Sequence, residues 1–351
     1  MHAQAGDRSL AGEPRDMASR ANPVRRRIGV TALLALLIGA LLLPVADATP
    51  EADRGPKTMV ALGDSYAAGP LVPPQVDERP FGCLRSSLNY AHQVADALAL
   101  ELTDVTCSGA STKHMWETHG VSPDAEFAEY GVPVLGPEHP GNPPQLDALR
   151  PDTDVVTVQI GGNDIGFGGI ATTCAEAALA QASCKDAVAE GKPFVRIAAA
   201  APKIAAVLDE VHRRSPGADI HVLGYPGIFR VGETASCPAM GVGEEDAQYL
   251  RSIQVALNEM IRRVAAASDQ TYSAAAGYVD VYGPSAGHTA CDLPLIRWVE
   301  PFVPVNAAAP VHPNLGGMSA VRDILLDEVW PKGLPRRSTG PGLPAPPDSP
   351  V

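Results

Sequence analysis

The chain has 351 residues and a formal net charge of −13 at pH 7. This acidic balance argues against nucleic-acid binding, which needs clustered Lys and Arg to displace counterions. The length accommodates one domain of ordinary size, which we place at 57–330, together with shorter segments at both ends.

The segment 1–48 is typical of a secretory signal peptide. Three arginines at 25–27 precede an uncharged apolar run at 28–43, and Ala48 offers a small residue for cleavage. The alternative is an N-terminal membrane anchor. However, the 16 residues of the run would form a helix only about 24 Å long, against about 30 Å of hydrocarbon. We therefore expect cleavage after Ala48 and a secreted protein, anchored only if the leader is kept.

The C-terminal segment 331–351 is dominated by Pro and Gly and is sparse in apolar residues. Such a sequence cannot bury enough surface to offset the entropy lost on ordering, so we expect it to be disordered.

Between these ends, short apolar runs alternate with amphipathic stretches. In chain order the pattern predicts a strand at 58–62, a helix at 88–100, strands at 101–106 and 154–160, a helix at 194–214, a strand at 219–223, a helix at 244–267, a strand at 278–282 and a helix at 315–329. The stretch 107–145 is expected to be irregular. This alternation predicts an α/β fold with a parallel sheet covered on both faces, whose sites form where strands end.

The chain has six cysteines, and an even number in an exported protein indicates disulfides. Their spacing alone does not choose among the possible pairings. A metal site is disfavoured because no C-x-x-C occurs. The six are Cys83, Cys107, Cys174, Cys184, Cys237 and Cys291.

Two polar motifs follow predicted strands. In Gly63-Asp64-Ser65-Tyr66, the glycine allows a sharp turn and the serine would begin a helical turn, which suits a nucleophile. The alternative is an ordinary Ser or Asp helix cap. In the second motif, at 161–164, the Asn163 amide could donate to an oxyanion, and the alternative is a common turn.

Two further stretches complete the set. His312 lies within Val311-His312-Pro313-Asn314. Histidine is the usual base for a serine nucleophile because its ordinary pKa lies near neutrality. The alternative is a histidine of a surface loop with no such role. In the small polar stretch 107–111, the Gly109 N–H could be a second oxyanion donor.

Taken in this order, the four stretches resemble the SGNH (GDSL) hydrolase family, whose blocks are named for a Ser, a Gly, an Asn and a His. The corresponding residues here are Ser65, Gly109, Asn163 and His312. The resemblance implies a flavodoxin-like three-layer α/β/α sandwich with a central parallel sheet. It also implies ester hydrolysis through an acyl-enzyme, with the Ser65 and Gly109 N–H groups and the Asn163 side chain as oxyanion hole. No cofactor or metal is implied.

Secreted actinobacterial lipases and esterases of this family are more closely similar, because they share six cysteines and a G-H-x-x-C segment followed by Trp, here 287–291 and Trp298. That resemblance implies the disulfides Cys83–Cys107, Cys174–Cys184 and Cys237–Cys291. We expect a monomer that acts on lipid or other esters and makes transient contact with lipid surfaces.

One position departs from the family pattern. Many members carry an Asp three residues before the His, where this chain has Ala309. A main-chain carbonyl can accept from the imidazole Nδ1, although it brings no charge to stabilise the imidazolium. We expect a Ser–His dyad oriented by the backbone near Ala309, with Asp280, Asp292 and Glu300 as alternative orienting groups.

Three other interpretations are open. Gly283-Pro284-Ser285-Ala286-Gly287 fits the G-x-S-x-G elbow, but the elbow must run into a helix and 288–298 contains a proline. A carbohydrate deacetylase or a phospholipase would share the fold. The apolar loop 298–311 suits an acyl chain, and the alternative is that its apolar residues only pack the loop. A non-catalytic secreted binding protein is the alternative of another class, since fold alone does not prove activity.

Overall fold

The computed structural model describes residues 57–76, 82–120, 141–189, 191–230, 237–271 and 276–329. The predicted signal peptide, 1–48, and the predicted disordered tail, 331–351, lie outside the described residues. Within the described ranges, no helix combines the length and the apolar character that crossing a membrane requires.

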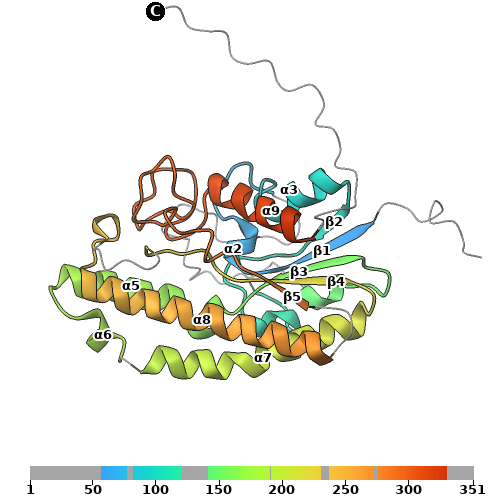
Figure 1. The fold of residues 1–351 in the computed structure, drawn as a ribbon, viewed down its shortest axis with the longest axis horizontal. Coiled ribbons are helices and arrows are strands. Elements are labelled where there is room, and N and C mark those ends of the chain that lie inside the picture. Colours follow the sequence, from blue (N-terminus) through green and yellow to red (C-terminus); the bar gives the residue numbers. More distant parts are fainter. Residues whose placement is uncertain are drawn as a thin grey trace, which may run out of the picture. The chain divides into compact units, whose positions relative to one another are not determined.

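Five parallel strands form one sheet in the order β2-β1-β3-β4-β5 (Figure 1). This is the flavodoxin-like order: β2 is added on one side of β1, and β3, β4 and β5 are added in turn on the other side. The sheet therefore confirms the predicted parallel α/β fold. The strands are β1 (Thr58–Gly63), β2 (Glu101–Asp104), β3 (Val155–Gln159), β4 (Asp219–Leu223) and β5 (Ala276–Val279).

Helices cover both faces of the sheet (Figure 1). Helices α3 (Tyr90–Leu98) and α9 (Leu315–Val329) lie on one face, and α7 (Lys192–Arg214) and α8 (Glu244–Thr271) lie on the other. Because side chains alternate along a strand, Met59 packs into the first layer and Val60 into the second. Among the described residues, the other helical segments are α2 (Ser65–Ala68), α4 (Gly162–Ile165), α5 (Phe167–Leu179), α6 (Cys184–Ala187) and the short 3₁₀ turns η3 (Thr112–Met115), η5 (Gln145–Ala148) and η6 (Pro238–Met240).

The observed elements agree with the sequence pattern except at particular places. Strand β4 and helix α9 have the predicted bounds, whereas β5 runs over 276–279 instead of 278–282. The strand ends early because the Asp280 carboxylate accepts hydrogen bonds from the backbone N–H groups of Tyr282 and Gly283, which turns the chain. Helix α5 was not predicted.

Three disulfides join the described cysteines in the pairs Cys83–Cys107, Cys174–Cys184 and Cys237–Cys291. These are the pairs that the family resemblance implies. The first fixes the chain just after β2, where the Cys107 N–H donates to the Gly63 carbonyl over 3.0 Å. It therefore holds the loop containing Gly109 against the end of β1.

Candidate active site

Ser65 is the first residue of α2, directly after β1. The preceding residue, Asp64, is the N-cap of this helix, and its carboxylate accepts from the Tyr66 N–H over 3.0 Å. Gly63 is required by close packing rather than by a turn, because an added Cβ would lie 2.8 Å from the Gln159 carbonyl oxygen of β3. The motif therefore contains both a helix cap and a serine at the carboxyl edge of the sheet.

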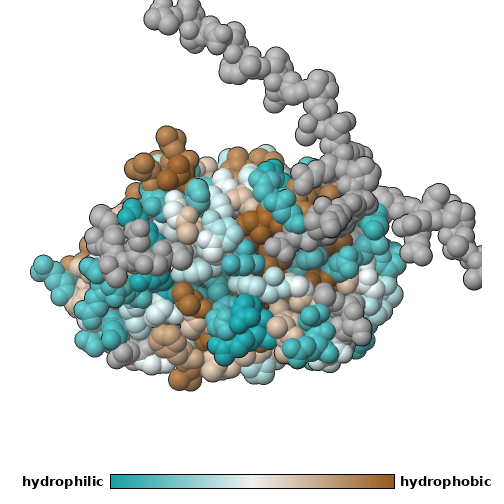
Figure 2. Space-filling model, viewed as in Figure 1, coloured by the Kyte–Doolittle hydropathy of each residue, from teal (hydrophilic) through white to brown (hydrophobic). Residues whose placement is uncertain are grey.

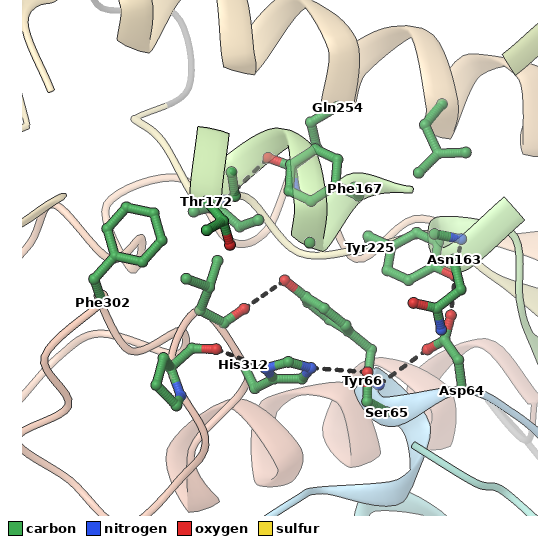
Figure 3. A pocket seen from close by; sticks show the side chains of 17 residues that line it. Asp64, Ser65, Tyr66, Asn163, Phe167, Thr172, Tyr225, Gln254, Phe302 and His312 are labelled. Atoms are coloured by element: carbon green, nitrogen blue, oxygen red, sulfur yellow. Dashed lines mark hydrogen bonds between the residues drawn. The ribbon is translucent and has the colours of Figure 1, made fainter. Parts of the chain in front are cut away.

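His312 lies opposite this serine, on the loop that precedes α9 (Figure 3). Its Nε2 is 2.8 Å from the Ser65 Oγ, a hydrogen-bonding distance between residues 247 positions apart in the chain. Ser65 itself is only 6% exposed. The fold thus brings together the serine of the first motif and the histidine of the last.

A main-chain carbonyl orients the imidazole. The His312 Nδ1 is 2.7 Å from the Pro310 carbonyl oxygen, which can only accept, so Nδ1 carries the proton and Nε2 faces Ser65 with a lone pair. Burial lowers the pKa of His312 to about 4, and the bond to Pro310 acts in the opposite direction. The histidine is consequently neutral at pH 7 and able to take a proton from the serine.

The three carboxylates considered as orienting groups serve other parts of the loop. Asp280 ends β5 as described above, and Asp292 accepts from the Thr289 N–H and hydroxyl. Glu300 is completely buried and accepts from the Val305 N–H at 2.9 Å and the Asn314 side chain at 2.6 Å. Although burial alone would raise the pKa of Glu300, its hydrogen bonds hold that pKa below its usual value. Glu300 therefore holds together the loop that carries His312.

Tyr66, the residue after Ser65, holds the same loop from the opposite side of the cleft. Its hydroxyl donates to the Val311 carbonyl over 2.6 Å, and its ring centroid is 5.1 Å from that of His312. Val311 has φ +61°, a left-handed conformation that is strained for a β-branched residue. The Tyr66 hydroxyl thus holds a strained residue directly beside the histidine.

A second network links the serine motif to the motif after β3. The Tyr225 hydroxyl donates to the Asp64 carboxylate over 2.5 Å and accepts from the Gly162 N–H over 2.9 Å. Burial raises the pKa of Asp64 to about 7, while the bonds from Tyr225 and the Tyr66 N–H lower it and the charge of Asp164 raises it. The helix cap beside Ser65 is therefore coupled to the backbone of α4.

Asn163 lines the same cleft as Ser65 and His312, and its amide donates to the Ala110 carbonyl over 2.8 Å. Ala110 follows Gly109, whose φ of +79° favours glycine. The two stretches predicted to supply oxyanion donors are thus tied together directly.

The cleft beside Ser65 has an empty volume of about 910 Å³, including the part open to solvent. One end holds Ser65, Asn163 and His312, and the rest extends along α5 toward Phe302 (Figure 3). Beyond Ser65 and His312 the cleft has a mixed lining, in which Thr172 and Gln254 lie among the apolar side chains of Phe167, Ala171, Ile228, Leu257 and Phe302.

The competing elbow at 283–287 does not form a nucleophile site. Ser285 is completely buried, and its hydroxyl donates to the Tyr282 carbonyl and accepts from the Gly227 N–H. The elbow does not run into a helix, because the next one, α9, begins only at Leu315. In the part of the chain that the structure describes, no three His, Cys, Asp or Glu side chains gather as metal ligands.

Sequence reasoning did not single out the roles of Tyr66 and Tyr225. Tyr66 belongs to the first motif, but its partner is a backbone carbonyl far away in the chain. Tyr225 follows the end of β4, and that position at the carboxyl edge of the sheet was the signal that could have found it.

Comparison with known proteins decides the family. The GDSL-like lipase/acylhydrolase family matches residues 61–320. The chain belongs to this family. Lipase 2 of Streptomyces coelicolor is 37% identical over 315 residues, covering 87% of this chain and 97% of that protein.

Other GDSL-like relatives agree with this assignment. A Streptomyces rimosus lipase is 29% identical over 296 residues, and the match covers 84% of this chain and 94% of that lipase. The solved structure of the extracellular lipase of Streptomyces rimosus matches with a TM-score of 0.58 and 25% identity, covering 77% of this chain and 98% of that one. Phospholipase A1 of Streptomyces albidoflavus has the same fold, with a TM-score of 0.59 at 24% identity and coverage of 77% and 98%. Membership of this family makes the protein an ester hydrolase.

Proposed function

We propose that the protein is a secreted lipase or carboxylesterase in which Ser65 is the nucleophile and His312 the general base. The observation that carries the proposal is the 2.8 Å separation of the Ser65 Oγ and the His312 Nε2. Nucleophile and base within hydrogen-bonding reach, with the base oriented by a third group, are the requirements for covalent ester hydrolysis.

The reaction follows from this arrangement. The neutral His312 takes the proton as the Ser65 Oγ attacks the ester carbonyl, and the imidazolium then returns that proton to the leaving alcohol. Water repeats the sequence on the acyl-enzyme and releases the acid. The Pro310 carbonyl keeps the Nδ1 proton in place throughout, without a charged third residue.

The negative charge that develops on the ester oxygen needs donors fixed in advance. We assign this role to the Ser65 and Gly109 N–H groups and to the Asn163 side chain. The bond from Asn163 to Ala110 supports the assignment because it holds the amide beside the glycine loop. Loss of one such donor typically costs about 3–4 kcal/mol of transition-state stabilisation.

The apolar side chains that line the cleft along α5 support an acyl substrate longer than acetate, and we place the acyl chain there, toward Phe302. Secretion is supported by the leader pattern at 1–48 and by three disulfides, which persist in oxidising compartments. We also propose that the enzyme is a monomer that meets its substrate at lipid surfaces. Recovery of a protein from the medium that begins at Thr49 would support the export route.

The assignment of Ser65 is tested by p-nitrophenyl butyrate hydrolysis and by labelling with a fluorophosphonate. Ser65→Ala should abolish labelling, and both Ser65→Ala and His312→Ala should lower kcat at least about a thousandfold. Ser285→Ala is the matched control and should keep labelling and kcat. Labelling that survives in Ser65→Ala would refute the assignment, as would loss of labelling in a Ser285→Ala protein that unfolds at the same urea concentration as its parent.

A further inference from the structure

Large apolar side chains are exposed on the loop between Cys291 and α9. Leu293, Leu295, Ile296, Val303 and Val305 expose 71, 97, 47, 77 and 67% of their surface, and together they are termed the apolar rim. Figure 2 shows hydrophobic residues gathered at the upper left, where Figure 1 draws this loop in orange-red. Contiguous exposed apolar surface of this kind marks an interaction site.

Between Leu293 and Val311 this loop presents no charged side chain to solvent, and the partly exposed Asp292 just before it is paired with Arg230 over 3.3 Å. From Leu293 to Val311 the charged residues are Arg297 and Glu300, which are 7% and 0% exposed. Their charged groups face each other across 3.9 Å. In a protein with a net charge of −13, the stretch 293–311 is therefore electrically neutral at its surface.

The apolar rim is held in place before any partner arrives. The Asn306 side chain donates to the Pro294 carbonyl over 2.9 Å and so joins the two parts of the loop that carry the rim. The buried Glu300 accepts from the Val305 and Asn306 N–H groups at 2.9 and 3.1 Å. Binding through this surface consequently needs little ordering of the loop, which lowers its entropic cost.

The loop also forms one wall of the catalytic cleft. Phe302 and Val311 line the cleft together with Ser65 and His312 (Figure 3). Phe302 directly precedes Val303 of the apolar rim. A surface that covers the rim would therefore meet the cleft wall that leads toward the serine.

From this position and chemistry we infer that the apolar rim is the surface through which the enzyme adsorbs to neutral lipid assemblies, with uncharged or zwitterionic headgroups. The inference rests on the proposed ester hydrolase and extends it from soluble esters to esters in an aggregated phase. An anionic surface is disfavoured because the protein carries excess negative charge, and the rim offers no cation to offset the repulsion.

The test uses protein recovered from the medium of a secreting host, with Ser65→Ala so that vesicles are not hydrolysed. Sedimentation measures binding to phosphatidylcholine vesicles and to equimolar phosphatidylcholine and phosphatidylserine. The rim variant combines Leu295→Ser, Val303→Ser and Val305→Ser. A control variant combines Leu179→Ser and Val195→Ser, whose side chains are 88% and 70% exposed on α5 and α7.

We expect the rim variant to bind phosphatidylcholine vesicles about a thousandfold more weakly, since it removes three apolar side chains and burial of each changes an equilibrium by about tenfold. The control variant should bind like its parent. With Ser65 restored, the rim variant should hydrolyse soluble p-nitrophenyl butyrate normally and an emulsified long-chain ester poorly. Unchanged vesicle binding, an equal loss in the control, or a preference for the anionic vesicles would overturn the inference. Absence of all ester hydrolysis would instead refute the proposed function, while leaving the binding test intact.

Discussion

Tyr66→Phe removes the hydroxyl that clamps Val311 and leaves the ring beside His312. The lost bond is worth about 1 kcal/mol net, and strain at a residue with positive φ stores about 1–3 kcal/mol, so the loop can relax once the clamp is gone. We expect kcat for p-nitrophenyl butyrate to fall about tenfold, which corresponds to about 1.4 kcal/mol, because the imidazole is less well positioned. KM should change little, since the cleft keeps its shape.

A second substitution separates positioning from a general structural defect. Glycine adopts positive φ without strain, so Val311→Gly should restore much of the kcat that Tyr66→Phe loses. Tyr282→Phe is the control, because the Tyr282 hydroxyl is buried and forms no hydrogen bond with the residues the structure describes. A wild-type kcat in Tyr66→Phe, or a double variant as slow as Tyr66→Phe alone, would refute this reasoning.

Three further predictions follow from the titratable groups. The proposed mechanism needs His312 to be neutral, and burial lowers the pKa of His312 to about 4, so kcat/KM should rise with pH around 4 and then stay level to neutrality. A midpoint near the ordinary histidine value would contradict this. Burial raises the pKa of Asp64 from 3.8 to about 7, so as pH rises the unfolded chain loses this proton first. The free energy of unfolding should therefore fall as pH rises from about 4 to about 7. Asp64→Asn should flatten that slope in urea titrations repeated across the range. Glu300→Gln should lower the free energy of unfolding by about 2 kcal/mol at pH 7. This difference should shrink as pH falls below 4.5, since the pKa of Glu300 is lower in the folded protein, and a constant difference would argue against the assigned bonds.

The parts of the fold that the sequence predicted are those in which local pattern and packing agree. Strand β4 is a short apolar run stopped by Gly224, and its bounds were predicted correctly. Helix α5 was missed because Gly168 and Gly169 lie in its first turn, where intrinsic propensity opposes a helix. Burial of Ile170 and the disulfide from Cys174 to Cys184 stabilise it instead, and neither is visible in local periodicity.

The site shows the same division. The residue types of the four motifs pointed to a serine and a histidine, and the structure brings these two together. The pattern could not show which carbonyl faces the imidazole, because every residue offers one and only the path of the loop selects Pro310. Nor could it show that Tyr66 would reach Val311, since that contact depends on a left-handed backbone conformation at a valine.

The atom that holds the imidazole belongs to the peptide unit at Pro310, so it is present whatever side chain occupies that position. A point mutation can delete a carboxylate from a Ser–His–Asp triad, but no single exchange of side chain can delete this acceptor. The orientation of the imidazole depends instead on the backbone path of the loop, which sets where the Pro310 carbonyl lies. Other side chains at position 310 should therefore be tolerated wherever the backbone of the loop keeps its path. Shortening or lengthening the loop should inactivate the enzyme.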